Sequence, residues 1–333
     1  MKKDTNKVYT LALNYVTAKV VLLAGKYKLD HLITSEGVSI LELAKHLALN
    51  AEALKRFLRV LEAHDIVTIA ENKVYRTELT EQLTRVRTPH LTKAYEAFEE
   101  LEYTLKSHQP AWNKKFGKDF YSTLDQDELN QFADWCRESG ESWLNGLFKL
   151  YDFSVYRQIV DVAGGQGHFL GSMLKNNAHQ KGTLFDLSAV VQHAEKVLNA
   201  YGCLDRANIV GGDFFQSVPG SGDLYVLCRT LLNWSDEDAS KILKVCAQSM
   251  SEEAKLLIVD FMLPPKSHPH YLRTVLNDLN LMVNWNSSSR TKQEWLDLVD
   301  KSQLSVIKTI ISDDAMVPEP FAPMILLECR RKQ

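Results

Sequence analysis

The stretch Asp161-Val-Ala-Gly-Gly-Gln-Gly167-His-Phe-Leu170 lies where a run of strand-forming residues ends and a helical pattern begins. Glycines at such a junction let the backbone turn sharply and approach a ligand closely, next to the N-terminus of a helix. The spacing departs from the GxGxxG pattern of dinucleotide-binding loops, because Leu170 stands where the third glycine belongs. The stretch therefore predicts a ligand-binding loop in an α/β domain and argues against a nicotinamide cofactor.

Segments with strand character alternate with helical patterns from about residue 157 onward. The predicted strands are Gln158–Val162, Thr183–Phe185, Asn208–Val210, Asp223–Cys228, Lys255–Asp260, Ser305–Ile311 and Met324–Arg330. The clearest helical patterns between them are Ser188–Ala200, Asp236–Met250 and Lys292–Asp300. This alternation predicts a doubly wound, mainly parallel sheet. Ligands of such sheets bind beyond the carboxyl ends of the strands, so the loops that follow the strands are the ones to inspect.

Acidic residues follow the second and third of these strands. Asp186 lies 19 residues past Gly167 and is placed to accept hydrogen bonds from ribose hydroxyls, although it could instead cap a helix that starts at Ser188. Asp213 precedes Phe214, a pair that can bind the amino group and cover the ring of adenine, although the same residues could form a simple turn. Together with the glycine loop, these features predict a ligand that contains adenosine.

The N-terminal part of the chain has a different pattern. Residues 8–85 predict helices followed by a hairpin, with Asn50 as a helix cap and Glu71–Lys73 as the turn, which is the outline of a winged helix. Winged helices often bind DNA, but acidic residues accompany the basic ones on the predicted second helix, which favours dimerisation instead. The apolar run from Val20 to Leu23, with Val16 before it, suits a partner helix and predicts a homodimer.

Composition narrows the class of protein further. The chain has 333 residues and a net charge of −3, so it suits two domains and carries no overall positive charge that would attract nucleic acid or anionic membranes. No signal peptide is expected, and no stretch is expected to reach the roughly 20 apolar residues of a membrane helix. The five cysteines are widely spaced without a CxxC pair, which is typical of free thiols in the cytoplasm and argues against a zinc site.

The ordered motifs resemble those of the S-adenosylmethionine-dependent O-methyltransferases of the hydroxyindole and caffeate type. They are Asp161–Leu170, Phe185–Leu187, Gly212–Phe215 and Arg229–Asp236, and the likeness covers nearly the whole chain. The resemblance implies a winged-helix dimerisation domain (1–88), a helical substrate-region linker (89–152) and a Rossmann-like domain with a seven-stranded sheet (153–333). It also implies cofactor contacts at Ala163, Gly164, Gly165, Gly167, Asp186, Leu187, Asp213, Phe214, Cys228 and Arg229.

The chain departs from this family at the catalytic positions. Leu232 stands where the family has its general-base histidine, and a leucine cannot accept a proton. Asn233 and Ser289 replace two family acids, whereas Asp260 keeps its carboxylate. Asp260 and Asn233 are thus the candidate catalytic residues, and we expect Asp260 to lie beside Leu232 with a pKa raised by burial. The candidate substrate contacts are Trp112, Phe116, Leu232, Trp234, Met282 and Trp285.

Three functions are compatible with this pattern. The first is methyl transfer to a small aromatic or polyketide-like metabolite by proximity and orientation, because a missing base lowers a rate by about 10²- to 10⁴-fold without abolishing the reaction. The second is non-methylating chemistry, such as hydroxylation, decarboxylation or rearrangement, in an enzyme that keeps the cofactor. The third is a cofactor-binding regulatory protein. His168, His268 and His270 are weaker candidates for a replacement base, and no third ligand accompanies the histidine pair to make a metal site.

Overall fold

The computed structural model describes residues 6–312 and 323–332. The chain forms two compact units, residues 1–96 and 97–333, so the helices between residues 97 and 152 belong to the second unit. Each unit has its own hydrophobic core, and each is described by itself below.

The first unit has the predicted arrangement of helices and a hairpin. Its helices are α1 (Lys7–Lys26), α2 (Leu29–Leu32), α3 (Ile40–His46), α4 (Ala51–Glu62) and most of α5 (Pro89–Ala97), with a 3₁₀ segment at Thr80–Val86. Its strands β1 (Val38–Ser39), β2 (Val67–Ala70) and β3 (Lys73–Arg76) form an antiparallel sheet in the order β1-β3-β2. The Asn50 side chain caps α4 by accepting a hydrogen bond of 3.0 Å from the Ala53 N–H, as predicted. Glu71 and Asn72 form the predicted turn with positive φ angles of 49° and 60°.

Helix α1 corrects one expectation. Its 20 residues have the length and composition of a membrane-spanning helix, with a mean hydropathy of 1.4, so the expectation that no stretch approaches this length is wrong. One such helix is weak evidence for a membrane span. The apolar run that was predicted to contact a partner helix is only partly available for this, because Val20 and Val21 pack against the core of their own unit. The exposed apolar side chains lie earlier, at Val8, Tyr9, Leu11, Leu13, Tyr15 and Val16.

The second unit is built on a seven-stranded sheet with the order β6-β5-β4-β7-β8-β10-β9. The strands are β4 (Gln158–Val162), β5 (Lys181–Asp186), β6 (Ala207–Gly211), β7 (Leu224–Cys228), β8 (Lys255–Phe261), β9 (Leu304–Ile311) and β10 (Met324–Arg331). All neighbouring pairs from β6 to β8 are parallel, and β10 runs antiparallel to both β8 and β9. The predicted mainly parallel, seven-stranded sheet is confirmed. Its order reverses between β4 and β7, which makes their carboxyl ends the expected place for a ligand.

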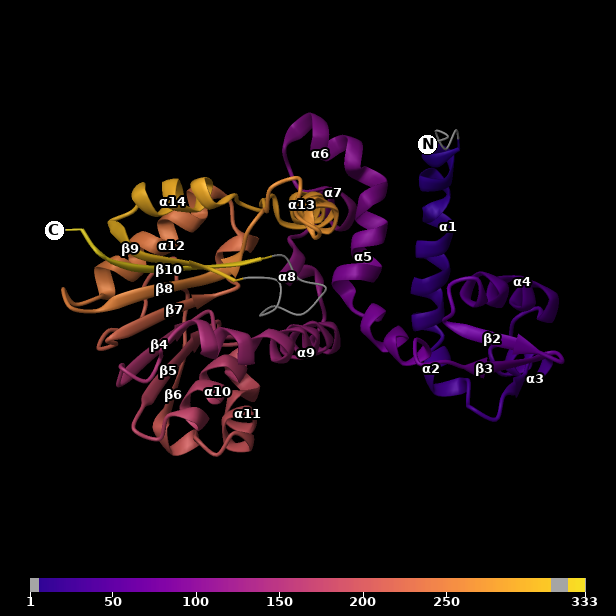
Figure 1. Ribbon diagram of the computed structural model, residues 1–333, viewed down its shortest axis with the longest axis horizontal. Coiled ribbons are helices and arrows are strands. Elements are labelled where there is room, and N and C mark those ends of the chain that lie inside the picture. Colours follow the sequence, from indigo (N-terminus) through magenta and orange to yellow (C-terminus); the bar gives the residue numbers. More distant parts are fainter. Residues whose placement is uncertain (1–5, 313–322, 333) are drawn as a thin grey trace. The chain divides into compact units, whose positions relative to one another are not determined.

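Both faces of this sheet are covered by helices because its central strands are apolar on both sides. On one face, Val160, Tyr225 and Ile258 pack with α12 (Asp236–Ser249) and α14 (Lys292–Asp300). On the other face, Ile159, Val226 and Leu257 pack with α10 (His168–Asn176) and α11 (Ala194–Ala200). Figure 1 shows the two helix pairs on opposite sides of the sheet. The sheet is thereby rigid, and its loops can hold functional groups in place.

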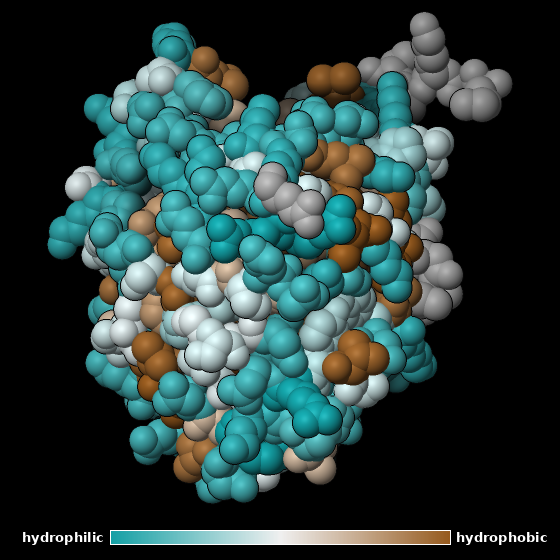
Figure 2. Space-filling view, turned by 90° about the vertical axis from the view of Figure 1, so that its left-hand side faces the viewer, coloured by the Kyte–Doolittle hydropathy of each residue, from teal (hydrophilic) through white to brown (hydrophobic). Residues whose placement is uncertain are grey.

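The remaining helices of this unit lie at the carboxyl ends of the parallel strands. They are α6 (Leu101–Ser107), α7 (Ala111–Phe116), α8 (Phe120–Thr123), α9 (Gln126–Leu150) and α13 (Tyr271–Trp285). In Figure 1, α8, α9 and α13 gather around the end of the sheet at which β4, β7 and β8 finish. The opposite end of the unit, which faces the viewer in Figure 2, is mostly hydrophilic with small hydrophobic groups scattered over it. The expected ligand site therefore lies between the carboxyl ends of the strands and helices α8, α9 and α13.

Candidate active site

The glycine loop after β4 adopts the backbone that its sequence predicts. Gly165 and Gly167 have positive φ angles of 61° and 88°, and Ala163 has a φ of 58°, which is unusual for a residue with a side chain. A Cβ added to Gly164 would lie 2.4 Å from the Asp161 carboxylate, so only glycine fits there. A Cβ on Gly165 would meet no atom within 4 Å, so space for a ligand lies beside this backbone. Gly167 directly precedes α10.

Asp186 connects the glycine loop to the end of β5. Its carboxylate accepts hydrogen bonds of 2.8 Å from the Gly165 N–H and 2.7 Å from the Leu187 N–H. Burial raises the pKa of Asp186, and these two N–H groups oppose that shift. Asp186 does not cap a helix that starts at Ser188. The next helical segment begins at Val191, and the Asp186 carboxylate instead binds the glycine loop. The exposed Leu187 follows it.

A second carboxylate, that of Asp161, lies beneath the loop. Asp161 is fully buried, and neither of its oxygens has a hydrogen-bond partner among the described residues. Burial raises its pKa to about 7, the nearby charge of Asp186 adds to the shift, and the Leu170 backbone N–H opposes it. A buried acid without a partner is costly, so its retention beside a ligand-binding loop marks a functional position.

The residues after β6 lie beside those that follow β7. The Asp213 carboxylate accepts a 2.9 Å hydrogen bond from the Phe215 N–H, which is the turn foreseen as the alternative to an adenine contact. The carboxylate is exposed and keeps a second oxygen for a ligand. The Phe214 ring lies edge-on to the Trp234 ring with centroids 5.6 Å apart. Phe214 and Trp234 thus meet at the same edge of the sheet.

Arg229 follows the last residue of β7, Cys228, with a strained φ of 56°. Its guanidinium carbon lies 5.5 Å from the Phe261 ring centroid and 5.8 Å from those of Trp135 and Trp143 on α9. Arg229 and Ala163 therefore carry left-handed backbone at the ends of the two strands where the sheet order reverses. Strain of this kind persists where the surrounding structure holds a functional site in place.

Leu232 and Asp260 are neighbours, as predicted. Leu232 lies in a 3₁₀ turn, Leu231–Asn233, and its backbone N–H donates to the Asp260 carboxylate over 3.1 Å. The Phe261 N–H donates to the other carboxylate oxygen over 2.9 Å. Asp260 is fully buried, and burial raises its pKa to about 7. Two backbone N–H groups therefore already bind this carboxylate, without a contribution from the Asn233 side chain.

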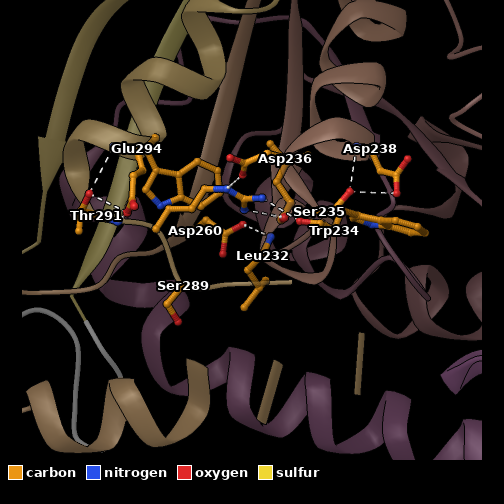
Figure 3. A network of polar contacts seen from close by, with 12 residues as sticks. Leu232, Trp234, Ser235, Asp236, Asp238, Asp260, Ser289, Thr291 and Glu294 are labelled. Carbon is orange, nitrogen blue, oxygen red and sulfur yellow. Dashed lines mark hydrogen bonds and ion pairs between the residues drawn. The ribbon is translucent and has the colours of Figure 1, made fainter. Parts of the chain in front are cut away.

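Figure 3 shows that the Leu232 and Ser289 side chains extend to the same side of this network, away from the hydrogen bonds around Trp234 and Asp236. Ser289 donates its backbone N–H to the Asp278 carboxylate on α13 over 2.5 Å. Leu232 and Ser289 thus place an apolar side chain and a hydroxyl group where the resembling family has its base and one of its acids. Asp260 is the one carboxylate that contacts the Leu232 backbone among the described residues.

Arg290 holds the Leu232 turn in place, a role that the sequence alone did not reveal. Its guanidinium is 2% exposed and donates to the carbonyls of Leu231 (3.0 Å) and Trp234 (2.7 Å) and to the carboxylate of Asp236 (2.8 Å). The Trp295 ring lies 4.9 Å from its guanidinium carbon. A planar group with several fixed donors suits this task better than a lysine would. Both ends of the turn are therefore fixed by one buried side chain.

The aromatic candidates for substrate binding form a cluster around Phe120. The ring centroids of Trp112 and Trp285 lie 4.7 Å and 4.5 Å from that of Phe120, and Phe116 lies 4.7 Å from Trp112. Trp112 is fully buried, so it supports the cluster from within. Met282 is half-buried on α13.

A cavity of about 240 Å³ opens beside this cluster, with Asn233, Trp234 and Trp285 among its lining residues. Sequence reasoning missed Asn284 and Asn286, which also line it; no periodic pattern marked these positions.

The histidines considered as replacement bases are engaged elsewhere. His168 is the first residue of α10, and its ring lies 6.2 Å from that of Tyr201. His268 accepts a hydrogen bond from the His270 N–H, and the two rings lie 5.5 Å apart. Within residues 6–312 and 323–332, no three His, Cys, Asp or Glu side chains are grouped as metal ligands.

Known proteins are similar to this chain over much of its length. Residues 98–304 match the model of the O-methyltransferase domain family. O-demethylpuromycin-O-methyltransferase of Streptomyces alboniger is 31% identical over 97% of this chain and 88% of its own length. Aclacinomycin 10-hydroxylase RdmB of Streptomyces purpurascens is 28% identical over 68% of this chain and 61% of its own length.

Solved structures share the fold. The O-methyltransferase NcsB1 from neocarzinostatin biosynthesis, in complex with S-adenosylmethionine and 2-hydroxy-5-methyl naphthoic acid, matches with a TM-score of 0.81 over 95% of this chain and 96% of its own, at 23% identity. The open space beside Gly165 fits a cofactor of this kind. The chain belongs to the O-methyltransferase family and is a methyltransferase that uses S-adenosylmethionine.

Proposed function

We propose that this enzyme methylates a small aromatic or polyketide-like metabolite of secondary metabolism, and that it does so by positioning the acceptor without a histidine base. One observation carries the second part of the proposal: Leu232 occupies the base position, and its backbone is fixed to the buried carboxylate of Asp260. The names of relatives, such as O-demethylpuromycin-O-methyltransferase, support a small aromatic acceptor.

The cofactor contacts are assigned to the residues at the strand ends. Asp186 would bind the ribose, Asp213 and Phe214 the adenine, and the backbone from Ala163 to Gly167 the remainder. When bound, S-adenosylmethionine supplies an electrophilic methyl group. The residues of the chain exclude water and hold the acceptor beside that group, and such positioning accounts for a large share of a barrier reduction.

Asp260 is the acid or base that remains at this centre. Its pKa of about 7 means that the carboxyl can hold or release a proton near neutral pH. The N–H groups of Leu232 and Phe261 fix both oxygens, so the carboxyl cannot swing freely towards a substrate. Asn233 lines the cavity, where its amide can bind a substrate oxygen. These contacts support positioning by Asn233. We assign proton transfer to Asp260, which contacts the Leu232 backbone but is not among the described residues that line the cavity.

A second candidate is non-methylating chemistry with the cofactor retained. The relative named aclacinomycin 10-hydroxylase supports it, because that name describes a hydroxylation within a family of methyltransferases. Leu232 and Ser289 also both differ from the residues that the resembling family has at its catalytic positions. The two candidates differ in what becomes of the cofactor, since only methyl transfer forms one S-adenosylhomocysteine per product.

The deciding experiment is a metabolite screen with purified protein that follows S-adenosylhomocysteine formation and product mass. A product heavier by one methyl group supports methyl transfer, and a changed product without S-adenosylhomocysteine supports the second candidate. Within the proposal, Leu232→His leaves activity unchanged or lowers it by crowding, whereas Asn233→Ala and Asp260→Asn lower it more. A rise in activity of Leu232→His above the pKa of the new histidine would show that the natural reaction lacks only its base.

We also propose that the enzyme is a cytoplasmic homodimer. The exposed apolar side chains in the first half of α1 support a partner surface, and the five cysteines are all free thiols. Neither nucleic acid nor membrane is proposed as a partner, because the net charge of −3 attracts neither.

A further inference from the structure

Helix α13 brings a carboxylate to Ser289, the residue that stands where the family has one of its acids. The Asp278 Oδ1 atom accepts the 2.5 Å hydrogen bond from the Ser289 N–H. The other carboxylate oxygen, Oδ2, has no hydrogen-bond or ion-pair partner among the described residues, and it is not one of the enclosed polar atoms of the protein. Asp278 is half-buried, so a ligand can reach Oδ2 while Oδ1 stays bound to the backbone.

Two observations place this carboxylate near the reaction centre. The Ser289 side chain extends to the same side as that of Leu232, which occupies the base position (Figure 3). Helix α13 also contacts the turn Leu231–Asn233, which carries Leu232. A methyl acceptor that lies against Leu232 is therefore expected to have the Asp278 carboxylate in its surroundings.

Asp278 also shares one face of α13 with two residues that were expected to contact the substrate. Met282 follows it by four residues and Trp285 by seven, and this spacing brings side chains to the same side of a helix. Trp285 lines the cavity of about 240 Å³ together with Asn233. Met282 and Trp285 offer apolar contacts to an aromatic ring, whereas Asp278 offers a hydrogen-bond acceptor at the other end of the same face.

No ion pair neutralises Asp278 among the described residues. Arg273 is the other charged residue of α13, and a separation of five residues turns the two side chains about 140° apart on the helix. The Arg290 guanidinium already donates to two carbonyls and to the Asp236 carboxylate. The free oxygen of Asp278 therefore favours a ligand group that donates a hydrogen bond, because such bonds are stronger to a charged group than to a neutral one.

We propose that Asp278 determines the substrate specificity of this site by accepting, through Oδ2, a hydrogen bond from a hydroxyl or amino group of the methyl acceptor. The acceptor class is thereby narrowed to aromatic molecules that carry such a donor. The inference rests on the proposed function, since the acceptor is taken to lie against Leu232. It gives the site a carboxylate beside residue 289 although residue 289 itself is a serine.

Three probes test the proposal on the wild type: 2,3-dihydroxynaphthalene, its monomethyl ether and its dimethyl ether. Each is titrated calorimetrically into the protein in the presence of S-adenosylhomocysteine, so that no methyl group can be transferred. The diol and the monoether each keep a donor and are expected to bind with similar affinity, whereas the diether, which has none, is expected to bind about tenfold more weakly. A purely steric effect of the methyl groups would instead lower the affinity stepwise.

Asp278→Asn separates the hydrogen bond to the substrate from the one to the backbone. The amide keeps an oxygen for the Ser289 N–H, so the melting temperature is expected to stay near that of the wild type, but its free end becomes a donor. The preference for the diol over the diether is expected to fall below about threefold. The matched control is Asp297→Asn on α14, because this exposed carboxylate likewise accepts a hydrogen bond, from the Gln293 side chain over 2.8 Å, and its substitution should leave the preference intact.

Three results would overturn the proposal: no measurable binding of the diol, a stepwise loss of affinity from diol to diether in the wild type, or an unchanged preference in a folded Asp278→Asn variant. The wild-type series decides alone if that variant does not fold. Failure of the proposed function would show differently, as absent S-adenosylhomocysteine formation from S-adenosylmethionine while the wild type still prefers the diol.

Discussion

Ala163 and Arg229 show at the scale of single residues how the chain holds its ligand site. Both have positive φ angles, 58° and 56°, at adjacent strand ends. The Ala163 N–H donates to the Phe185 carbonyl over 2.8 Å, and the Arg229 N–H donates to the Val259 carbonyl over 2.7 Å. These bonds to neighbouring strands keep each residue in a conformation that costs roughly 1–2 kcal/mol for a side chain other than glycine. The sheet thus stores strain where its order reverses.

The strain at Ala163 is open to a direct test. Ala163→Gly is expected to raise the free energy of unfolding by about 1 kcal/mol and to leave cofactor affinity nearly unchanged, because the backbone contact survives. Urea denaturation and calorimetry measure the two quantities. The control Ala133→Gly, within helix α9, is expected to lower stability by roughly 0.5–1 kcal/mol. A loss of stability in Ala163→Gly would contradict the assignment of strain.

Asp186 carries the second prediction at this scale. Asp186→Ala is expected to weaken the binding of S-adenosylmethionine and S-adenosylhomocysteine by roughly 1.5–3 kcal/mol, because charged hydrogen bonds to the ribose are lost. The Gly165 N–H also loses its partner, so the glycine loop is less well held. Isothermal calorimetry checks the effect, and Asp205→Ala, at an exposed position outside the site, is expected to change nothing. Equal affinities in the two variants would argue against Asp186 as the ribose ligand.

The 3₁₀ turn Leu231–Asn233 is the element on which the reaction centre depends, and Arg290 fixes it. Arg290→Lys keeps the charge but loses the forked donors, so at least one of the carbonyls of Leu231 and Trp234 is left unpaired. We expect the free energy of unfolding to fall by about 2–3 kcal/mol and methyl transfer to fall with it. Denaturant titration compares it with Arg330→Lys at an exposed strand position, which is expected to behave as wild type. Full activity in Arg290→Lys would show that the turn needs no such support.

The elements themselves were largely predictable from the sequence. Gln158–Val162 and Lys292–Asp300 were predicted with the boundaries observed, because apolar periodicity and capping residues act locally. Ser188–Ala200 was predicted as one helix, but it contains a 3₁₀ segment at Val191–His193 before α11 begins at Ala194. Local pattern does not distinguish these helix types near a terminus.

The contacts that complete the site were harder to predict from the sequence. Arg290 binds carbonyls 59 and 56 residues away, and no periodicity encodes such a pairing. The strain at Ala163 was also invisible, because an alanine in a sequence does not reveal a positive φ angle. The neighbourhood of Leu232 and Asp260 could be predicted because Leu232 follows β7 and Asp260 lies near the carboxyl end of the adjacent strand β8. Sequence therefore located the loops, and tertiary contacts decided how their side chains are held.

Buried carboxyl groups, among them those of Asp161 and Asp260, couple the stability of the whole molecule to pH. The pKa of Asp161 and that of Asp260 are each raised by burial to about 7, whereas an unfolded aspartate titrates near about 3.9. Between these values the folded protein binds more protons than the unfolded chain, so the contribution of these groups to stability falls as pH rises. At low pH both groups are neutral in either state, and their burial costs least.

Asp161→Asn and Asp260→Asn test this coupling. Each variant is expected to gain stability relative to wild type as pH rises from about 4 to 8, by an amount on the order of 1–3 kcal/mol, because an amide does not have to lose a proton. Urea titrations across this pH range measure the difference. Asp205→Asn, at an exposed position, is expected to show no such trend. If the free energy of unfolding depends on pH in the same way in the wild type and the two variants, neither carboxyl has a raised pKa.

Assembly is the remaining question at the molecular scale, and α1 decides it. Val8, Leu11 and Val16 are 81%, 57% and 38% exposed, and they are spaced so that a turn or two of helix separates them. An exposed apolar helix surface of this kind marks an interface, and a two-fold axis lets one surface serve both subunits. Light scattering at micromolar concentration is expected to give the mass of a dimer for the wild type and of a monomer for the double variant Leu11→Glu, Val16→Glu. Leu105→Glu is the matched control, because this leucine is 67% exposed on the second unit and its substitution should leave the dimer intact. A wild-type monomer would refute the dimer, and flotation of the wild type but not of the double variant with phospholipid vesicles would assign the same apolar surface to a membrane instead.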